Sequence, residues 1–403
     1  MELPTSDRYQ KMSVDSFNTE KLLTNASRQR DARNFLDFPI IDTDAHQYET
    51  ESMSEIIEFI DDDVLQHLGR ANPNFFSGGR GGYQPMGGRI TRYPLRKIEE
   101  TPVDGIHRDI HLSRRFMDAM GIDYMCLFPT GMLSVGLMPQ KDVELALSRA
   151  YTRWMIEKVL PGDNRVKGLV YLPFNSPDEC YKVVQDFGDK PGVAGFLITS
   201  PRHNSVHDNA YMKTYALIEE MGKPITFHSG VNWNEPMMAV TNRFIAAHAL
   251  GFTLYNVVHM CNWIVNGLPE RFPKLKIIWT ESGLAWVPWL AQRLDNDYKM
   301  RSSECPLLTK LPSEYMKDMY YTSQPMEKPN DLEFLEMTFK MINADTQLLY
   351  ASDYPHWDMD LPSVIYDLPF LSEQSKRNIL GENAIRVFDL DVSERFPDFK
   401  LAS

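Results

Sequence analysis

Three carboxylates and a histidine stand close together after a short apolar run near the start of the chain. The stretch FPIIDTDAHQYE, residues 38–49, contains Asp42, Asp44, His46 and Glu49. Asp44 and His46 are two residues apart, so on a strand both side chains point to the same face. A carboxylate and an imidazole on one face can bind a single cation. The stretch therefore predicts part of a divalent metal site.

Further candidates stand at the ends of later apolar runs. His228 ends the run KPITFH, Glu281 follows LKIIWT, and Asp353 follows LLYAS, with His356 three residues further on. Together with the pair on the first run, these residues form a mixed nitrogen and oxygen set that suits zinc, manganese or iron. Water bound to such a metal is acidified toward neutrality, and a neighbouring carboxylate can take its proton. Since each residue alone is commonly a hydrogen-bonded core residue, the prediction depends on their convergence.

Eight short apolar runs must position these residues. They cover residues 39–46, 123–130, 166–173, 192–200, 223–230, 275–282, 319–325 and 348–355. Short runs closed by polar residues, Pro or Gly are typical of strands buried on both faces. Helical patterns such as DVELALSRAYTRWMIEKVL lie between most of them, which predicts parallel βαβ units. Eight units predict an α/β fold of the (β/α)8 TIM-like barrel type, in which the carboxyl ends of the strands meet at one mouth.

The segment between the first two runs is too long for a simple connection. It includes FFSGGRGGYQPMGGRITRYP, residues 75–94, and in a barrel it would form a long insertion after strand 1, over the mouth. A surface loop and a lid are both consistent with this composition. Its arginines Arg80, Arg89 and Arg92 are candidates for binding an anionic substrate.

The composition predicts one large globular domain with two short extensions. Residues 1–36 are polar and predict an N-terminal arm that packs on a neighbouring subunit, residues 37–392 predict the barrel, and residues 393–403 a C-terminal tail. The chain has 403 residues, of which 43% are apolar and 24% charged, as in ordinary globular proteins.

Charge and cysteine usage limit the partners and the compartment. A net charge of −13 argues against nucleic acid and anionic membranes, because no basic surplus is present to neutralise phosphates. The four cysteines show no CxxC spacing and fit a reducing compartment. The N-terminus lacks the apolar segment of a secretory signal, and no run of 18 apolar residues occurs. A cytoplasmic protein with no membrane partner is therefore predicted.

At these residues the chain resembles the amidohydrolase superfamily, in the branch of aminocarboxymuconate-semialdehyde decarboxylase and the aromatic-acid decarboxylases. The resemblance covers about residues 38–390, through MDAMGIDYMCLFPT, GKPITFHSG, LPERFPKLKIIWTESGLAWVPWLAQRLD, LLYASDYPH and ILGENAIRVFDL. It implies a distorted (β/α)8 barrel with a divalent metal at the mouth. By this resemblance the metal ligands are Asp44, His46, His228 and Asp353.

One position departs from the decarboxylase pattern. Those enzymes resemble FAHGGG after the FPKLK motif, with a histidine that acts on metal-bound water or on the substrate, whereas this chain has WTESGLAW and so Glu281. At neutral pH a glutamate is more naturally a base or a metal ligand. With Glu49 and Glu281 added, the ligands exceed what one metal uses, so one and two cations per chain are both considered.

Three classes of enzyme are consistent with these residues. The first is a metal-dependent hydrolase that attacks a C–N or ester-type bond of a small, aromatic or carboxylated substrate with metal-bound hydroxide. In it Asp353 is the general base, Glu281 a second base or a ligand, and His228 part of the catalytic centre. The alternatives are a dinuclear non-haem iron or manganese oxygenase and a non-oxidative aromatic-acid decarboxylase. A non-catalytic scaffold subunit that retains a metal is the fourth reading, and a homo-oligomer, or a hetero-oligomer with a related subunit, is expected.

Overall fold

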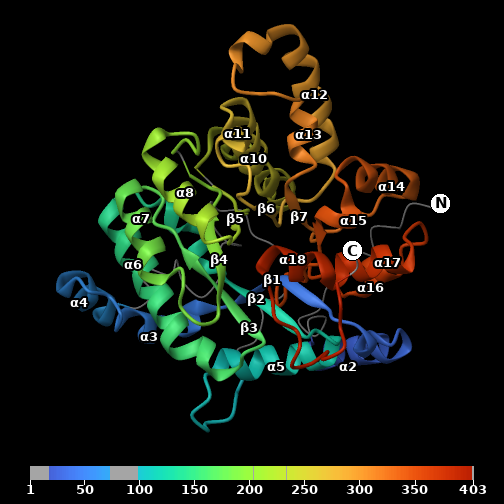
Figure 1. Ribbon diagram of the computed structural model, residues 1–403. Coiled ribbons are helices and arrows are strands. Elements are labelled where there is room, and N and C mark those ends of the chain that lie inside the picture. The colour runs from blue at the N-terminus through green and yellow to red at the C-terminus, as the bar shows by residue number, and fades with distance from the viewer. Residues whose placement is uncertain (1–17, 73–98, 203, 233, 402–403) are drawn as a thin grey trace.

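Residues 18–72, 99–202, 204–232 and 234–401 are described by the computed structural model. Within them, eight parallel strands follow one another around a nearly closed barrel, with helices outside it (Figure 1). The strands are β1 (Ile41–Gln47), β2 (Tyr124–Pro129), β3 (Val166–Tyr171), β4 (Val193–Thr199), β5 (Ile225–His228), β6 (Ile277–Thr280), β7 (Tyr320–Thr322) and β8 (Leu348–Leu349). Seven of them lie within the predicted runs and β1 extends one residue beyond its run, so the (β/α)8 fold is confirmed.

Backbone hydrogen bonds join the first strand to the segment that contains the last. The amide of Thr43 donates to the carbonyl of Tyr350 at 3.0 Å, and the amide of Asp353 donates to the carbonyl of Asp44 at 2.7 Å. Asp42 supports the same seam, because its carboxylate accepts hydrogen bonds from the amide of Ser352 at 2.9 Å and from the Ser352 hydroxyl. These contacts bring the carboxyl ends of β1 and β8 together.

The larger helices cover the outside of the barrel (Figure 1). Those of nine or more residues are α2 (Thr19–Ala32), α4 (Asp63–Ala71), α5 (Arg108–Met120), α6 (Lys141–Trp154), α7 (Pro177–Phe187), α8 (Met212–Glu220), α10 (Phe244–Val265), α12 (Trp286–Arg301) and α14 (Leu332–Met341). The shorter α-helices are α3 (Met53–Ile57), α9 (Pro236–Ala239), α11 (Leu268–Arg271), α13 (Pro312–Met316), α15 (Ala344–Gln347), α16 (Ser363–Tyr366), α17 (Glu373–Arg377) and α18 (Asn383–Phe388). Short 3-10 or π-helical turns include Glu49–Glu51 after β1 and Gly131–Leu137 after β2.

Helix α2 occupies most of the described part of the predicted arm. It begins after Asn18, whose side chain accepts a hydrogen bond from the amide of Lys21, a usual N-cap. Its buried residues Leu23 and Ala26 belong to the main core, and the Arg30 guanidinium donates to the carbonyl of Asp118 in α5. These residues therefore pack on the barrel of their own chain rather than extending away from it. The division into arm, barrel and tail stays a prediction.

The insertion after β1 is described only at its two ends. Helices α3 and α4 form its first part, and α3 lies against α6, where the Trp154 indole donates to Glu55 at 3.1 Å. The predicted substrate-binding residues Arg80, Arg89 and Arg92 lie outside the described residues. Their role in substrate binding stays a prediction.

Helix α10 is long and apolar enough, by length and composition, to span a membrane, and it is the one such helix in the described part of the chain. Core helices of soluble proteins pass the same test, so this is weak evidence. Ala247, Phe252 and Trp263 on α10 are buried in the protein. The absence of a membrane partner and the cytoplasmic location stay predictions.

Candidate metal centre

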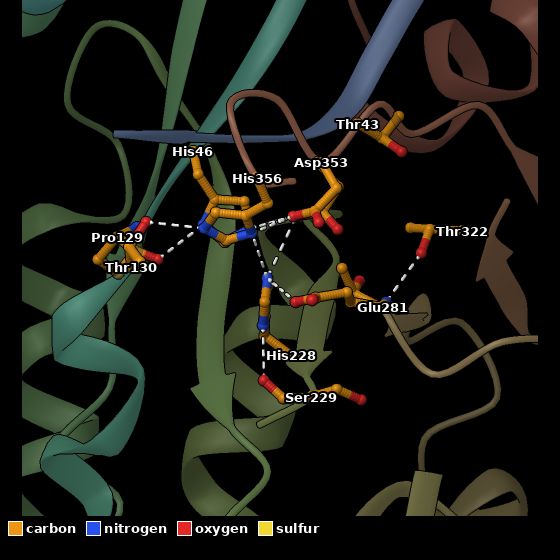
Figure 2. Close-up of polar contacts among 12 residues, drawn as sticks. Thr43, His46, Pro129, Thr130, His228, Ser229, Glu281, Thr322, Asp353 and His356 are labelled. Atoms are coloured by element: carbon orange, nitrogen blue, oxygen red, sulfur yellow. Dashed lines mark hydrogen bonds and ion pairs between the residues drawn. The ribbon is translucent and has the colours of Figure 1, made fainter. Parts of the chain in front are cut away.

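Side chains from four strand ends converge at the mouth of the barrel (Figure 2). Two sets of buried side chains could each bind a metal ion, because within each set the ligating atoms all lie within 4.8 Å of one another. One set is Asp44, His46, His228 and Glu281, and the other is His46, Asp353 and His356. They come from β1, from the last residue of β5, and from the turns that follow β6 and β8. The structure thus brings together all the sequence candidates for metal binding in the described residues except Glu49.

The spacing of the ligating atoms fits a divalent cation. His228 Nε2 lies 3.2 Å from Asp44 Oδ1 and 3.2 Å from His46 Nε2. His46 Nε2 lies 3.4 Å from Asp44 Oδ1 and 3.3 Å from Asp353 Oδ1. Tetrahedral ligands at about 2.0–2.1 Å from an ion are about 3.3–3.4 Å apart. The donor set and its dimensions therefore suit zinc, manganese or iron.

Backbone carbonyls fix which nitrogen of each histidine faces the centre. Nδ1 of His46 lies 2.9 Å from the carbonyl of Pro129, and Nδ1 of His228 lies 2.9 Å from the carbonyl of Ser229. A carbonyl oxygen only accepts, so in both neutral rings Nδ1 carries the proton and Nε2 presents a lone pair. Two facing lone pairs repel unless a cation lies between them. Carbonyl partners of this kind are usual for metal-binding histidines.

Several carboxylate oxygens at the centre lack hydrogen-bond donors among the described residues, including one of Asp44 and one of Glu281. Asp44 Oδ2 and Glu281 Oε2 are buried and have no hydrogen-bond partner among the described residues. Glu281 Oε2 lies 3.6 Å from His228 Nε2. Buried charges are normally paired or bound to metal, so oxygens left in this state point to a cation.

The electrostatics of the cluster show the crowding of its charges. Burial and then the charge of Asp44 raise the pKa of Glu281 well above its usual range. Burial and then the charge of Glu281 do the same to the pKa of Asp353. Burial also opposes ionisation of Asp44, but His228 and His46, when protonated, outweigh it and hold the pKa of that carboxyl below its usual range, and a bound cation would supply the same positive charge beside neutral rings. Burial lowers the pKa of His46, which keeps the ring neutral as a ligand requires.

Glu281, directly after β6, and Asp353, four residues after β8, both have left-handed backbone conformations. Their φ angles are 54° and 58°, which cost a non-glycine residue about 1–3 kcal/mol. The amide of Glu281 donates to the Thr322 hydroxyl at 3.0 Å, and Asp353 is held by its bond to Asp44 across the seam. Strain of this kind is concentrated at functional sites.

Glu49 lies apart from the cluster, contrary to its prediction as a metal ligand. Its Oε2 accepts a hydrogen bond from the amide of Thr130 at 2.8 Å, and its Oε1 accepts one from the amide of Met132 at 2.6 Å. Both oxygens are therefore engaged by the turn that follows β2. Asp42, at the seam, is likewise engaged by donors. Only the middle pair of the opening stretch, Asp44 and His46, reaches the centre.

A second apolar cluster beside the centre was not found from the sequence. It consists of Val231, Met238, Phe244, Ala247 and Phe252, with Trp357 packed against it. The ring of His248 lies 5.3 Å from that of Trp357, and its Nε2 lies 3.7 Å from Asp358 Oδ2. These residues come from three separate segments, so no local pattern could have grouped them. His259 on α10 lies within the core, where its Nε2 donates to the carbonyl of Ser200 at 2.8 Å.

Comparison with known proteins places the chain in a family. Residues 41–390 match the model of the amidohydrolase family, so the chain belongs to that family. It is 20% identical over 287 residues to a 2-amino-3-carboxymuconate-6-semialdehyde decarboxylase of Dictyostelium discoideum, covering 70% of this chain and 77% of the relative. It is 18% identical over 297 residues to a gamma-resorcylate decarboxylase of Rhodococcus jostii (strain RHA1), covering 70% of this chain and 88% of the relative.

Solved structures share the fold. An amidohydrolase of Mycobacterium avium subsp. paratuberculosis K-10 gives a TM-score of 0.67 at 21% identity, over 87% of this chain and 99% of the other. A dihydroxybenzoic acid decarboxylase of Polaromonas sp. JS666, solved with manganese and the inhibitor 2-nitroresorcinol, gives a TM-score of 0.62 at 17% identity. The match covers 89% of this chain and 99% of the other. The resemblance seen in the sequence is confirmed.

Proposed function

We propose that this chain is a metal-dependent, non-oxidative decarboxylase of a small aromatic or enol-type carboxylic acid. The observation that carries the proposal is the buried set of carboxylates and Nε2 lone pairs at the mouth. The choice of reaction is supported by the curated relatives, which are decarboxylases of acids of this kind. This ranks decarboxylation above the hydrolysis that the sequence favoured.

The ligands in this proposal are Asp44, His46, His228 and Asp353, whose donor types and spacing fit the ion. Manganese is the first choice, because a structural relative was solved with it, and zinc and iron suit the same donors. A divalent cation held there would polarise an oxygen of the substrate and bind its negative charge. The two Nδ1–carbonyl bonds hold the histidine rings in the orientation that this requires.

Glu281 is the residue we assign to proton transfer. Decarboxylation without an oxidant replaces a C–CO2⁻ bond by a C–H bond, so one proton enters and one CO2 leaves. Glu281 stands where the decarboxylase pattern has a histidine, and its Oε2 faces the cluster with no donor of its own among the described residues. It would hold the proton at Oε2 and deliver it to the carbon that loses CO2. Thr322 fixes the backbone that aims this side chain.

The test is turnover of hydroxybenzoates and related carboxylic acids under nitrogen by protein reconstituted with Mn²⁺. Release of one CO2 per substrate consumed is expected, with one deuterium from D2O on the carbon that carried the carboxylate. Turnover that needs oxygen would instead support the oxygenase. If none of the acids released CO2 and the protein also failed to bind metal, the proposal would be wrong.

Hydrolysis remains the second candidate because of Glu281. A carboxylate beside the centre can take a proton from an attacking water as readily as it can deliver one to carbon. The same protein assayed with aryl esters and amides in H2¹⁸O separates the two reactions. Label in the released acid without CO2 would place hydrolysis first.

The homo-oligomer is part of this proposal and is tested by the mass of the protein in solution.

A further inference from the structure

His356 adjoins the centre on the side of Asp353 (Figure 2). Its Nδ1 lies 2.6 Å from Asp353 Oδ1, and its ring lies 4.2 Å from that of His46, centre to centre. The side chain is 4% exposed. His356 is outside the four ligands of the proposed centre, yet its nitrogen faces the same carboxylate.

Thr130 determines which nitrogen of His356 carries the proton. The Thr130 hydroxyl donates its single hydrogen to the carbonyl of Gln47 at 3.0 Å. Toward His356 Nε2, at 3.2 Å, the hydroxyl oxygen must therefore accept. The neutral ring then carries its proton on Nε2 and presents the lone pair of Nδ1 to Asp353.

Three atoms that can bind a metal ion lie together here. They are His356 Nδ1, Asp353 Oδ1 and His46 Nε2, which lies 3.3 Å from the same oxygen. The proton of His46 is on Nδ1, bonded to the carbonyl of Pro129. A proton shared between His356 Nδ1 and Asp353 Oδ1 joins only those two atoms and leaves His46 Nε2 facing the same oxygen, whereas a metal ion can bind all three at once.

We propose that His356 is a further metal ligand, binding through Nδ1 on the Asp353 side of the centre. This inference rests on the metal dependence in the proposed function and goes beyond its ligand set. Thr130 is then a positioning residue that holds the ring in the ligating tautomer, as second partners of metal-binding histidines do. Glu49 completes the chain of contacts by binding the amide of Thr130.

The experiment counts the coordinated imidazoles. Cu²⁺ is loaded into chelator-treated protein, and pulsed electron paramagnetic resonance measures the number of imidazole rings bound to it. Three are expected for the wild type and two for His356→Ala. His259→Ala removes a buried histidine that hydrogen-bonds a carbonyl away from the centre, so three are expected for this control.

Metal affinity gives the second measurement. Co²⁺ titration should show weaker binding for His356→Ala, and a loss of about 10–100-fold for Thr130→Val, which removes a second partner. Thr130→Ser keeps the hydroxyl and should restore affinity.

Two imidazoles in both the wild type and His356→Ala, with unchanged Co²⁺ affinity, would overturn the inference and leave a simple ion pair between His356 and Asp353. If His356→Ala does not fold, Thr130→Val and Thr130→Ser test the inference instead, and equal Co²⁺ affinity of Thr130→Val and the wild type would overturn it. Failure of the wild type to bind any of these ions would overturn the proposed function as well. A metal-binding wild type with only two imidazoles removes this inference alone.

Discussion

Two groups of equally buried carboxylates in this barrel differ in the hydrogen-bond donors that surround them. Asp42 and Glu49, in the stretch of residues 38–49, accept hydrogen bonds from backbone amides of other segments. Asp44 and Glu281 each keep a buried oxygen with no donor among the described residues. Burial therefore does not separate structural carboxylates from those of the centre. The supply of donors does, because a buried oxygen without one needs a cation or a proton of its own.

The largest effect is expected from removing a proposed metal ligand that contacts the second group. His228→Ala takes away the imidazole nearest to Asp44. Loss of a residue that only hydrogen-bonds a metal ligand lowers metal affinity by up to about 100-fold. Loss of the ligand itself should lower the affinity of the variant for Mn²⁺ by more than this, and turnover should fall as well. Metal content by mass spectrometry and calorimetric titration measure this. Retained metal and full activity would contradict the assignment.

The wild type should lose thermal stability on chelation, and His228→Ala should not. A ligand that binds only the folded state at 100 times its Kd stabilises it by about 2.7 kcal/mol. Thermal unfolding with and without chelator gives this difference, with the variant as the matched control.

Glu281→Gln distinguishes the functions considered for this carboxylate. As a proton-transfer group it should keep the metal while turnover falls by about 10²–10⁴-fold. As the ligand of a second cation it should lower the metal content toward one per chain. Neither metal content nor rate would change if the side chain were only structural. We expect the first outcome.

A pair of alanine variants tests the comparison of the two groups directly. Asp42→Ala leaves the amide of Ser352 without its acceptor, which costs about 1–3 kcal/mol for each unsatisfied group. Asp44→Ala leaves no such donor and should change the metal-free stability less while it weakens metal binding. Urea unfolding of the metal-free proteins measures the free energies. The reverse order would show that burial, not the supply of donors, sets the difference.

The smallest effect is expected from Glu49→Gln. One oxygen can still accept from a backbone amide, while the new NH2 group faces the second amide donor. A loss of about 1.5–3 kcal/mol in the free energy of unfolding follows from one lost hydrogen bond to a charged group. Metal content should stay at the wild-type level, which a metal ligand would not allow.

The sequence predicted the barrel and most of its centre for a common reason. Strand ends in a (β/α)8 barrel meet at one mouth, so His228 and Asp353 could be assigned together with the pair on β1 although long stretches of chain separate them. The function of Glu49 could not be predicted this way, because its donors lie in the turn after β2. The left-handed backbone at Glu281 was equally hidden, since tertiary contacts such as that with Thr322 impose it.

The seam between β1 and β8 also governs when the centre can exist during the life of the chain. Asp44 and His46 are synthesised about 300 residues before Asp353. The amide of Asp353 bonds to the carbonyl of Asp44, so docking of the last strand and assembly of the metal-binding side chains are one event. A nascent chain that lacks its C-terminal part would present the first half of the centre without the residues that complete it. Metal loading should therefore follow synthesis and docking of the segment that contains Asp353.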